Sequence, residues 1–77
     1  MAEKFEAGKV YKLSPENKIH MIWRVVSVDD DGTGHGVYIY YPFYPEAVGD
    51  PWITDAVDVY DEISEEEAVL YQMARDK

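Results

Sequence analysis

The sequence predicts a mostly β domain with one C-terminal α-helix, built on a curled antiparallel sheet of three to four strands. Three observations lead to this fold class. Residues 19–44 form two arms rich in Val, Ile, Trp, Tyr and Phe, which favour strands, joined by an acidic segment with three glycines. Residues 53–60 alternate between apolar and polar side chains, as a strand with one face in water does. Ser64 and Glu67 form a capping box, which marks the start of a helix.

The first strand is expected in the segment FEAGKVYKL, residues 5–13, where Gly8 provides a turn. Val10 and Tyr11 are the residues of this segment that we most expect to be buried. Residues 14–17 are predicted to form a second turn, because Pro15 fixes φ and lacks an amide donor and Asn17 tolerates left-handed geometry.

A long β-hairpin is expected next, with strands over residues 19–28 and 37–41 and a loop over residues 29–36. A turn centred between Gly32 and Thr33 would pair Val28 with Val37. Because side chains alternate along a strand, this register gives the hairpin two apolar sides. The side expected to form the core carries Ile22, Val26, Val28, Val37, Ile39 and Phe43. The opposite, aromatic side carries Trp23, Tyr38, Tyr40 and Tyr44.

The rest of the chain is predicted as a loop over residues 44–52, a fourth strand over 53–60 and a helix over 65–75. Asp55 falls on the apolar side of the fourth strand, so this strand must be short or bulged near its start. The helix has a narrow apolar stripe of Val69, Leu70, Met73 and Ala74, with Arg75 and Lys77 near its negative end. Eleven residues are too few for an isolated helix in water, so we expect the stripe to dock on the aromatic side of the hairpin.

The segment FEAGKVYKL followed by a long bent hairpin resembles an SH3-like barrel over residues 5–60. This resemblance implies a small closed sheet. An open curled antiparallel sheet with one helix fits the same pattern of elements, and both architectures remain as predictions.

Composition and charge indicate a single small acidic domain over residues 1–77. The chain has 47% hydrophobic residues and no cysteine, which excludes a disordered tail and a thiolate zinc site. Its formal net charge is −9, and residues 25–74 contain twelve acids and no Lys or Arg. Such a span repels nucleic acid and anionic membranes and attracts basic proteins. Without an apolar run of membrane-spanning length or a signal-peptide pattern, the expected location is the cytoplasm.

No pattern in the sequence supports catalysis, a cofactor or a metal. The loop from Asp29 to Gly34 resembles the start of an EF-hand calcium loop, but Tyr40 stands where the bidentate Glu is required. His20 and His35 fall at opposite ends of the hairpin, too far apart to share a metal. The chain also lacks the glycine-rich phosphate-binding motifs and the H-E-x-x-H motif. We therefore expect a protein that is not an enzyme.

Two surfaces are candidates for binding another protein. The first is aromatic and consists of Tyr38, Tyr40 and Tyr44, which either the helix or a partner would cover. A basic groove for a nucleic-acid backbone does not accompany these rings, which argues against direct nucleic-acid binding. The second is acidic and consists of Asp55, Asp58, Asp61, Glu62, Glu65 and Glu66.

These surfaces predict a non-catalytic acidic protein-binding module that occupies a basic, nucleic-acid-binding surface of a partner protein. In size, charge and aromatic content the chain is similar to small DNA mimics, whose carboxylates imitate DNA phosphates and which are often phage-encoded inhibitors. The alternative is a small scaffold or assembly domain that binds by apolar contacts, as a homodimer or a complex subunit. In that case the acidity serves solubility alone.

Overall fold

The computed structural model describes residues 3–14 and 18–75, with side chains as far as Met73. The predicted turn at residues 14–17 and the side chains of Ala74, Arg75 and Lys77 therefore lie wholly or partly outside the described part. Within these residues the elements are five strands, two 3-10 turns and one α-helix: β1 (Val10–Leu13), β2 (Met21–Val28), β3 (Gly34–Tyr40), η2 (Pro45–Ala47), β4 (Pro51–Thr54), η3 (Val57–Val59), β5 (Asp61–Ile63) and α1 (Glu65–Arg75).

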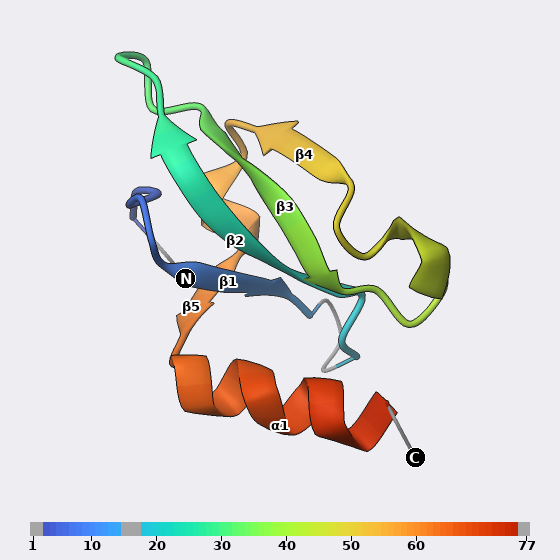
Figure 1. Ribbon diagram of the computed structural model, residues 1–77. Helices are drawn as coiled ribbons and strands as arrows, with labels where there is room; N and C mark the ends of the chain where they lie inside the picture. Colours follow the sequence, from blue (N-terminus) through green and yellow to red (C-terminus); the bar gives the residue numbers. More distant parts are fainter. Residues whose placement is uncertain (1–2, 15–17, 76–77) are drawn as a thin grey trace.

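The five strands form one antiparallel sheet in the order β4-β3-β2-β1-β5, with α1 below it in Figure 1. This architecture confirms the prediction of a mostly β fold with one C-terminal helix. The sheet is open, with β4 and β5 as its edges, so the open-sheet alternative holds rather than the closed SH3-like barrel. None of the helices in the described residues is long and apolar enough to cross a membrane.

The predicted hairpin is present, but its register differs from the expected one. Val28 pairs with Gly34 instead of Val37, because the turn closes early: the Asp29 amide donates to the Thr33 carbonyl and the Gly32 amide donates to the Asp29 carbonyl. Two glycines expected in the loop thus belong to β3. Register irregularities lie between Ile22 and Trp23 and between Val25 and Ser27.

The predicted fourth strand is wrong in extent, because the chain turns where Asp55 would have pointed into the core. The Thr54 hydroxyl accepts a hydrogen bond from the Ala56 amide (3.2 Å), and the Val57 amide donates to the Asp55 carbonyl (2.9 Å). The predicted strand over residues 53–60 is therefore replaced by the end of β4 and by η3, and β5 begins only at Asp61. The sheet consequently has five strands, one more than the upper number expected.

The main core lies on the aromatic side of the hairpin, which corrects the predicted choice of side. Phe5, Tyr11, Met21, Trp23, Val25 and Tyr60 are buried there. The Phe5 ring meets the rings of Tyr11 and Trp23 edge-on, at centroid distances of 5.1 and 5.2 Å. Two residues assigned to the core from the sequence, Val26 and Phe43, are 63% and 62% exposed.

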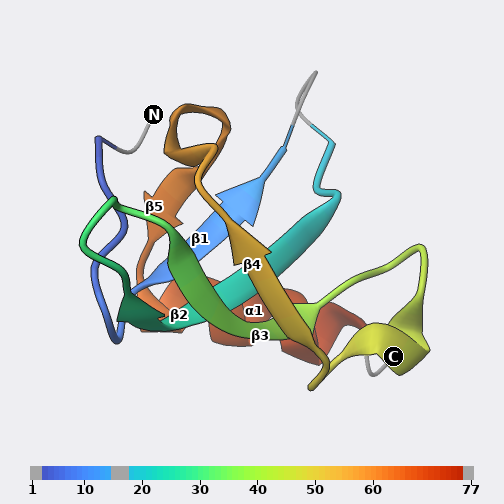
Figure 2. The same ribbon diagram turned by 90° about the horizontal axis from the view of Figure 1, so that it is seen from above.

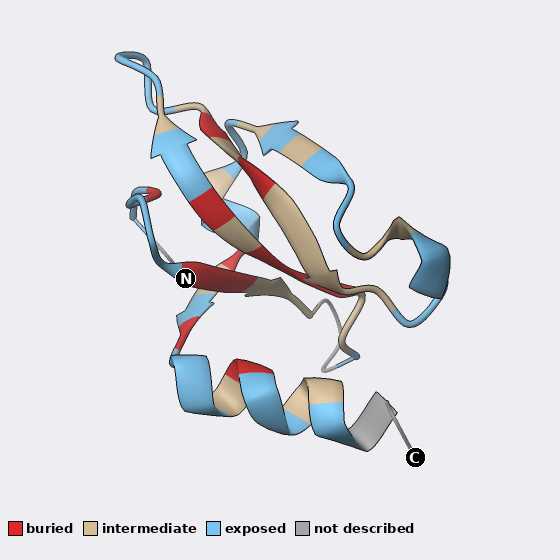
Figure 3. Cartoon of the chain, in the orientation of Figure 1, coloured by how far each residue is buried: buried red, intermediate tan, exposed pale blue. Residues whose placement is uncertain are grey.

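The opposite face of the sheet carries a second cluster of buried residues, and α1 covers it. Val10, Ile22 and Ile63 pack there with Ala68 of the helix. Figure 2 shows α1 crossing beneath β2 and β3. The expected docking of the helix on the aromatic side is thus wrong, because the N-terminal segment and Tyr60 occupy that side. Figure 3 shows that the buried part of α1 is a short inward-facing patch and that much of its surface is exposed.

Candidate protein-binding surface

The six acidic residues predicted to bind a partner all lie on the segment 55–66, which contains the edge strand β5. Asp55 precedes η3 and Asp58 lies within it, both exposed. Asp61 is half-buried and Glu62 exposed on β5, while Glu65 and Glu66 are exposed in the first turn of α1. These positions place the six carboxylates on one continuous segment that leads from the end of β4 through η3 and β5 into α1.

Ion pairs divide five of these six carboxylates into two groups, to neither of which Asp61 is assigned. The Lys9 ammonium lies 3.6 Å from the Glu62 carboxylate, and the Arg24 guanidinium makes a two-pronged contact with Glu65. The hydrogen bonds from Arg24 lower the pKa of Glu65 below its ordinary value and raise the pKa of Arg24. Bases of the N-terminal third therefore neutralise the middle of the acidic segment.

Asp55, Asp58 and Glu66 form the second group, and no base in the described residues pairs with them. All three are exposed. They lie on either side of the neutralised stretch, where their charge remains available to a ligand. We call these three residues the free acidic group.

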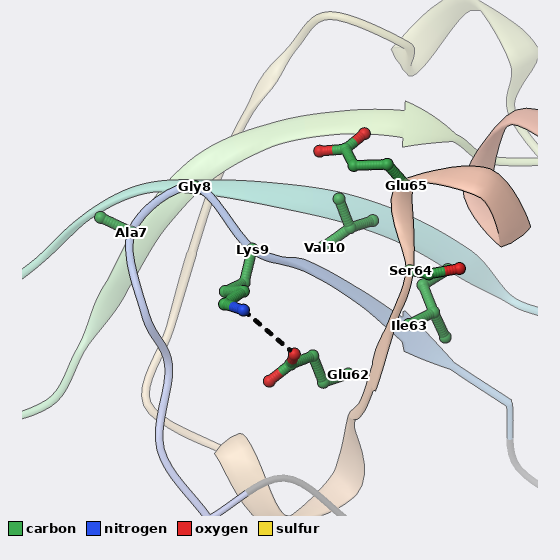
Figure 4. A pocket seen from close by; sticks show the side chains of 8 residues that line it. All are labelled: Ala7, Gly8, Lys9, Val10, Glu62, Ile63, Ser64 and Glu65. Atoms are coloured by element: carbon green, nitrogen blue, oxygen red, sulfur yellow. Dashed lines mark ion pairs between the residues drawn. The ribbon is translucent and has the colours of Figure 1, made fainter.

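A shallow groove of about 430 Å³ separates residues 7–10 from residues 62–65 (Figure 4). Lys9 and Glu62 point toward each other across it, and the apolar side chains of Val10 and Ile63 form part of its lining. Opposite charges compensate each other here, and the lining contains neither a histidine nor a nucleophile held by a base. The lining thus combines a compensated ion pair with two apolar side chains.

Tyr38 belongs to an aromatic cluster on the core side of β3 and β4. Its ring lies 5.0 Å from that of Tyr41 and 5.5 Å from that of Trp52, measured between centroids. Burial raises the pKa of Tyr38 to about 12. Next to it, the Trp52 indole N–H donates to the Tyr60 hydroxyl at 3.2 Å. Tyr38 is half-buried, so only part of its ring is open to a partner.

The three predicted tyrosines do not form one patch. The register irregularity at Ile22 places Tyr40 opposite Ile22, on the helix side of the sheet, where its ring lies 5.9 Å from that of Tyr71. Tyr44 follows β3 in a loop and is 58% exposed beside Tyr41. Tyr40 therefore packs against the helix, Tyr38 packs in the aromatic cluster of β3 and β4, and Tyr44 is largely exposed to solvent.

The sequence prediction missed the surface with the largest exposed apolar side chains of the helix. Val69, Leu70 and Met73, expected to dock on the sheet, point away from it and are 46%, 66% and 58% exposed. Ala68 and Tyr71 face the sheet instead. A signal was present in the sequence, because Lys12 and Arg24 stand on strands where they can attract the acids of the first helical turn.

The acidic hairpin loop is a hydrogen-bonded turn. The Thr33 amide donates to the Asp31 carboxylate at 3.0 Å, which lowers the pKa of Asp31. His35 Nε2 lies 2.7 Å from the Asp29 carboxylate. In the described part of the chain, no three His, Asp or Glu side chains gather closely enough to hold a metal ion.

Comparison with protein-family models, with curated proteins and with solved structures gave no match for this chain. Its function must therefore be inferred from its own surface.

Proposed function

We propose that this chain is a non-catalytic acidic protein-binding module that docks on a basic surface of a partner protein, a surface with which the partner binds nucleic acid. The observation that carries this proposal is the free acidic group. Its three carboxylates are exposed on the segment 55–66, and Lys9, Lys12 and Arg24 are held by other acids.

The ion pairs also determine the sign of the surrounding field. Residues 1–24 carry five of the seven bases, and three of these (Lys9, Lys12 and Arg24) contact acids of residues 62–67. Residues 1–24 therefore do not form a separate positively charged surface that would attract nucleic acid to the chain. Carboxylates that remain free on the surface attract a basic partner and accelerate its association.

The proposal predicts binding that weakens steeply as salt rises. A partner captured from a host lysate should bind at least about tenfold more weakly at about 500 mM than at about 50 mM salt, because screening shortens the reach of exposed charges. A duplex DNA oligonucleotide should compete with this chain for the partner and displace the partner from it. The variant D55N/D58N/E66Q should show the loss already at low salt.

The matched control is Glu62→Gln, because this carboxylate is already paired with Lys9. For each carboxylate removed, it should weaken binding less than the triple variant does. Affinity that does not respond to salt, or a partner that DNA does not displace, would refute the proposal.

The second candidate is a scaffold or assembly domain, and the exposed outer face of α1 is the observation that favours it. Apolar side chains that a helix presents to water commonly mark a protein interface. Affinity of such a domain for its partner would be nearly independent of salt, so the same titration distinguishes the two functions.

A further inference from the structure

The outer face of α1 combines three large apolar side chains with one carboxylate. Val69, Leu70 and Met73 lie three, four and seven positions after Glu66, so all four share one side of the helix. The three apolar residues are about half exposed or more. Glu66 is exposed and belongs to the free acidic group.

The contacts on the inner side hold the helix in this rotation. Glu65 is bound by Arg24, and the Glu67 carboxylate lies 3.4 Å from the Lys12 ammonium. Near the other end, the Gln72 amide donates to the Ile39 carbonyl at 3.0 Å. Between these contacts Ala68 is 1% exposed and lets the helix approach the sheet closely. The apolar face is thus presented to solvent by a helix fixed along its length.

We propose that the outer face of α1 is the docking site for a basic amphipathic helix of the partner protein, an inference that rests on the proposed function. The apolar side of that helix would cover Val69, Leu70 and Met73, and its lysines or arginines would lie against Glu66. Methionine and leucine adapt well to such contacts, since their side chains are flexible and apolar.

Charge selects this occupant over a second copy of the chain. Each copy carries a formal net charge of −9, so association of two copies brings like charges together. A basic helix brings opposite charges together and covers the same apolar side chains. The two occupants also respond to salt in opposite directions, because screening weakens the first association and strengthens the second.

Two synthetic peptides of about 18 residues, or about five helical turns, test the proposal. The first has leucines on one helical face and lysines and alanines elsewhere, and the second has glutamine in place of every leucine. Fluorescence anisotropy at about 50 mM salt should show that the chain binds the leucine peptide at least about tenfold more tightly. The Leu70→Gln variant should lose this preference; both residues are good helix formers and the position is exposed, so the fold is kept.

Ile53→Thr is the matched control, because Ile53 is 54% exposed on β4 and lies outside the helix. This variant should keep the tenfold preference. Equal affinity for the two peptides, or a Leu70→Gln variant that behaves as the parent chain does, would overturn the docking site. If both peptides bind equally and salt-sensitively, the docking site fails and the proposed function stands.

The proposed function fails as well if neither peptide binds at low salt. Sedimentation of the chain without peptide measures its oligomeric state and tests the second copy as the occupant. A dimer that strengthens as salt rises and that Leu70→Gln dissociates would show that a second copy covers this face, which would overturn the proposal.

Discussion

Replacing Gly36 with alanine should destabilise the fold more than an equivalent change at any exposed turn glycine. Gly36 pairs with Val25 where the irregularity in β2 begins, and the two backbones approach closely there. A Cβ at this position would lie 1.8 Å from the Arg24 carbonyl oxygen and 2.8 Å from its carbon. Both atoms belong to the backbone, so no rotation of a side chain can relieve the clash.

The size of the effect follows from the distance the strands must move. Real Cβ contacts below 3.0 Å essentially never occur, so β2 and β3 must separate by at least roughly 1.2 Å. The separation breaks one or two ladder hydrogen bonds, and each of them contributes about 1 kcal/mol to the free energy of unfolding. Looser packing around Trp23 lowers that free energy by a further amount of about 1 kcal/mol or more. We expect a loss of about 3 kcal/mol, from a total of about 4–12 kcal/mol for a domain of this length.

Urea unfolding followed by circular dichroism measures this loss, and the midpoint of thermal unfolding should fall by about 12–24 °C. Gly32→Ala is the control, because Gly32 has φ of 93° and nothing within 4 Å of a new Cβ. Its left-handed strain should cost about 1–2 kcal/mol. The reasoning fails if Gly36→Ala is no more destabilising than Gly32→Ala.

Three further predictions follow from individual contacts. Ser64→Ala removes the acceptor of the Glu67 amide (3.1 Å) and should cost about 1 kcal/mol in urea unfolding; an unchanged midpoint would show that the cap is dispensable. Burial raises the pKa of Tyr38 from 10.0 to about 12, so the neutral form of Tyr38 stabilises the fold below pH 10. This stabilisation should disappear as the pH rises from 10 to 12. Ultraviolet titration of the parent chain and of Tyr38→Phe checks the shift. In Arg24→Gln the pKa of Glu65 should return upward toward its ordinary value in an NMR titration, and a pKa that does not move would contradict the assigned cause.

Local signals in the sequence were enough to predict the first strand and the helix. The helix was expected over residues 65–75 and spans Glu65–Arg75, because Ser64 is a strong capping residue and its hydroxyl accepts the Glu67 amide as expected. Val10 and Tyr11 are buried as predicted. Capping and alternation act over a few residues, so they can be recognised without knowledge of the fold.

Local signals could not predict which side of the hairpin forms the main core or which side of the helix faces the sheet. Both sides of the hairpin are apolar, and the side that became the main core was decided by Phe5 and Tyr60, which are distant in sequence. The rotation of the helix was decided by Arg24 and Lys12 rather than by its apolar stripe. These two ion pairs join residues more than forty positions apart, and periodicity within one segment carries no information on such contacts.

The pairing of β1 with β5 has a consequence for the order in which the molecule folds. β2, β3 and β4 are neighbours along the chain and can assemble through short connections, whereas Val10 meets Ile63 only by closing a loop of about 53 residues. Such a closure costs about 3.5 kcal/mol in chain entropy and favours late formation of the contact. During synthesis the N-terminal bases emerge long before the acids of β5 and α1 that neutralise them. The charge pattern that a partner meets therefore forms only when β5 and α1 have folded. A nascent chain that lacks these elements exposes unpaired N-terminal bases instead.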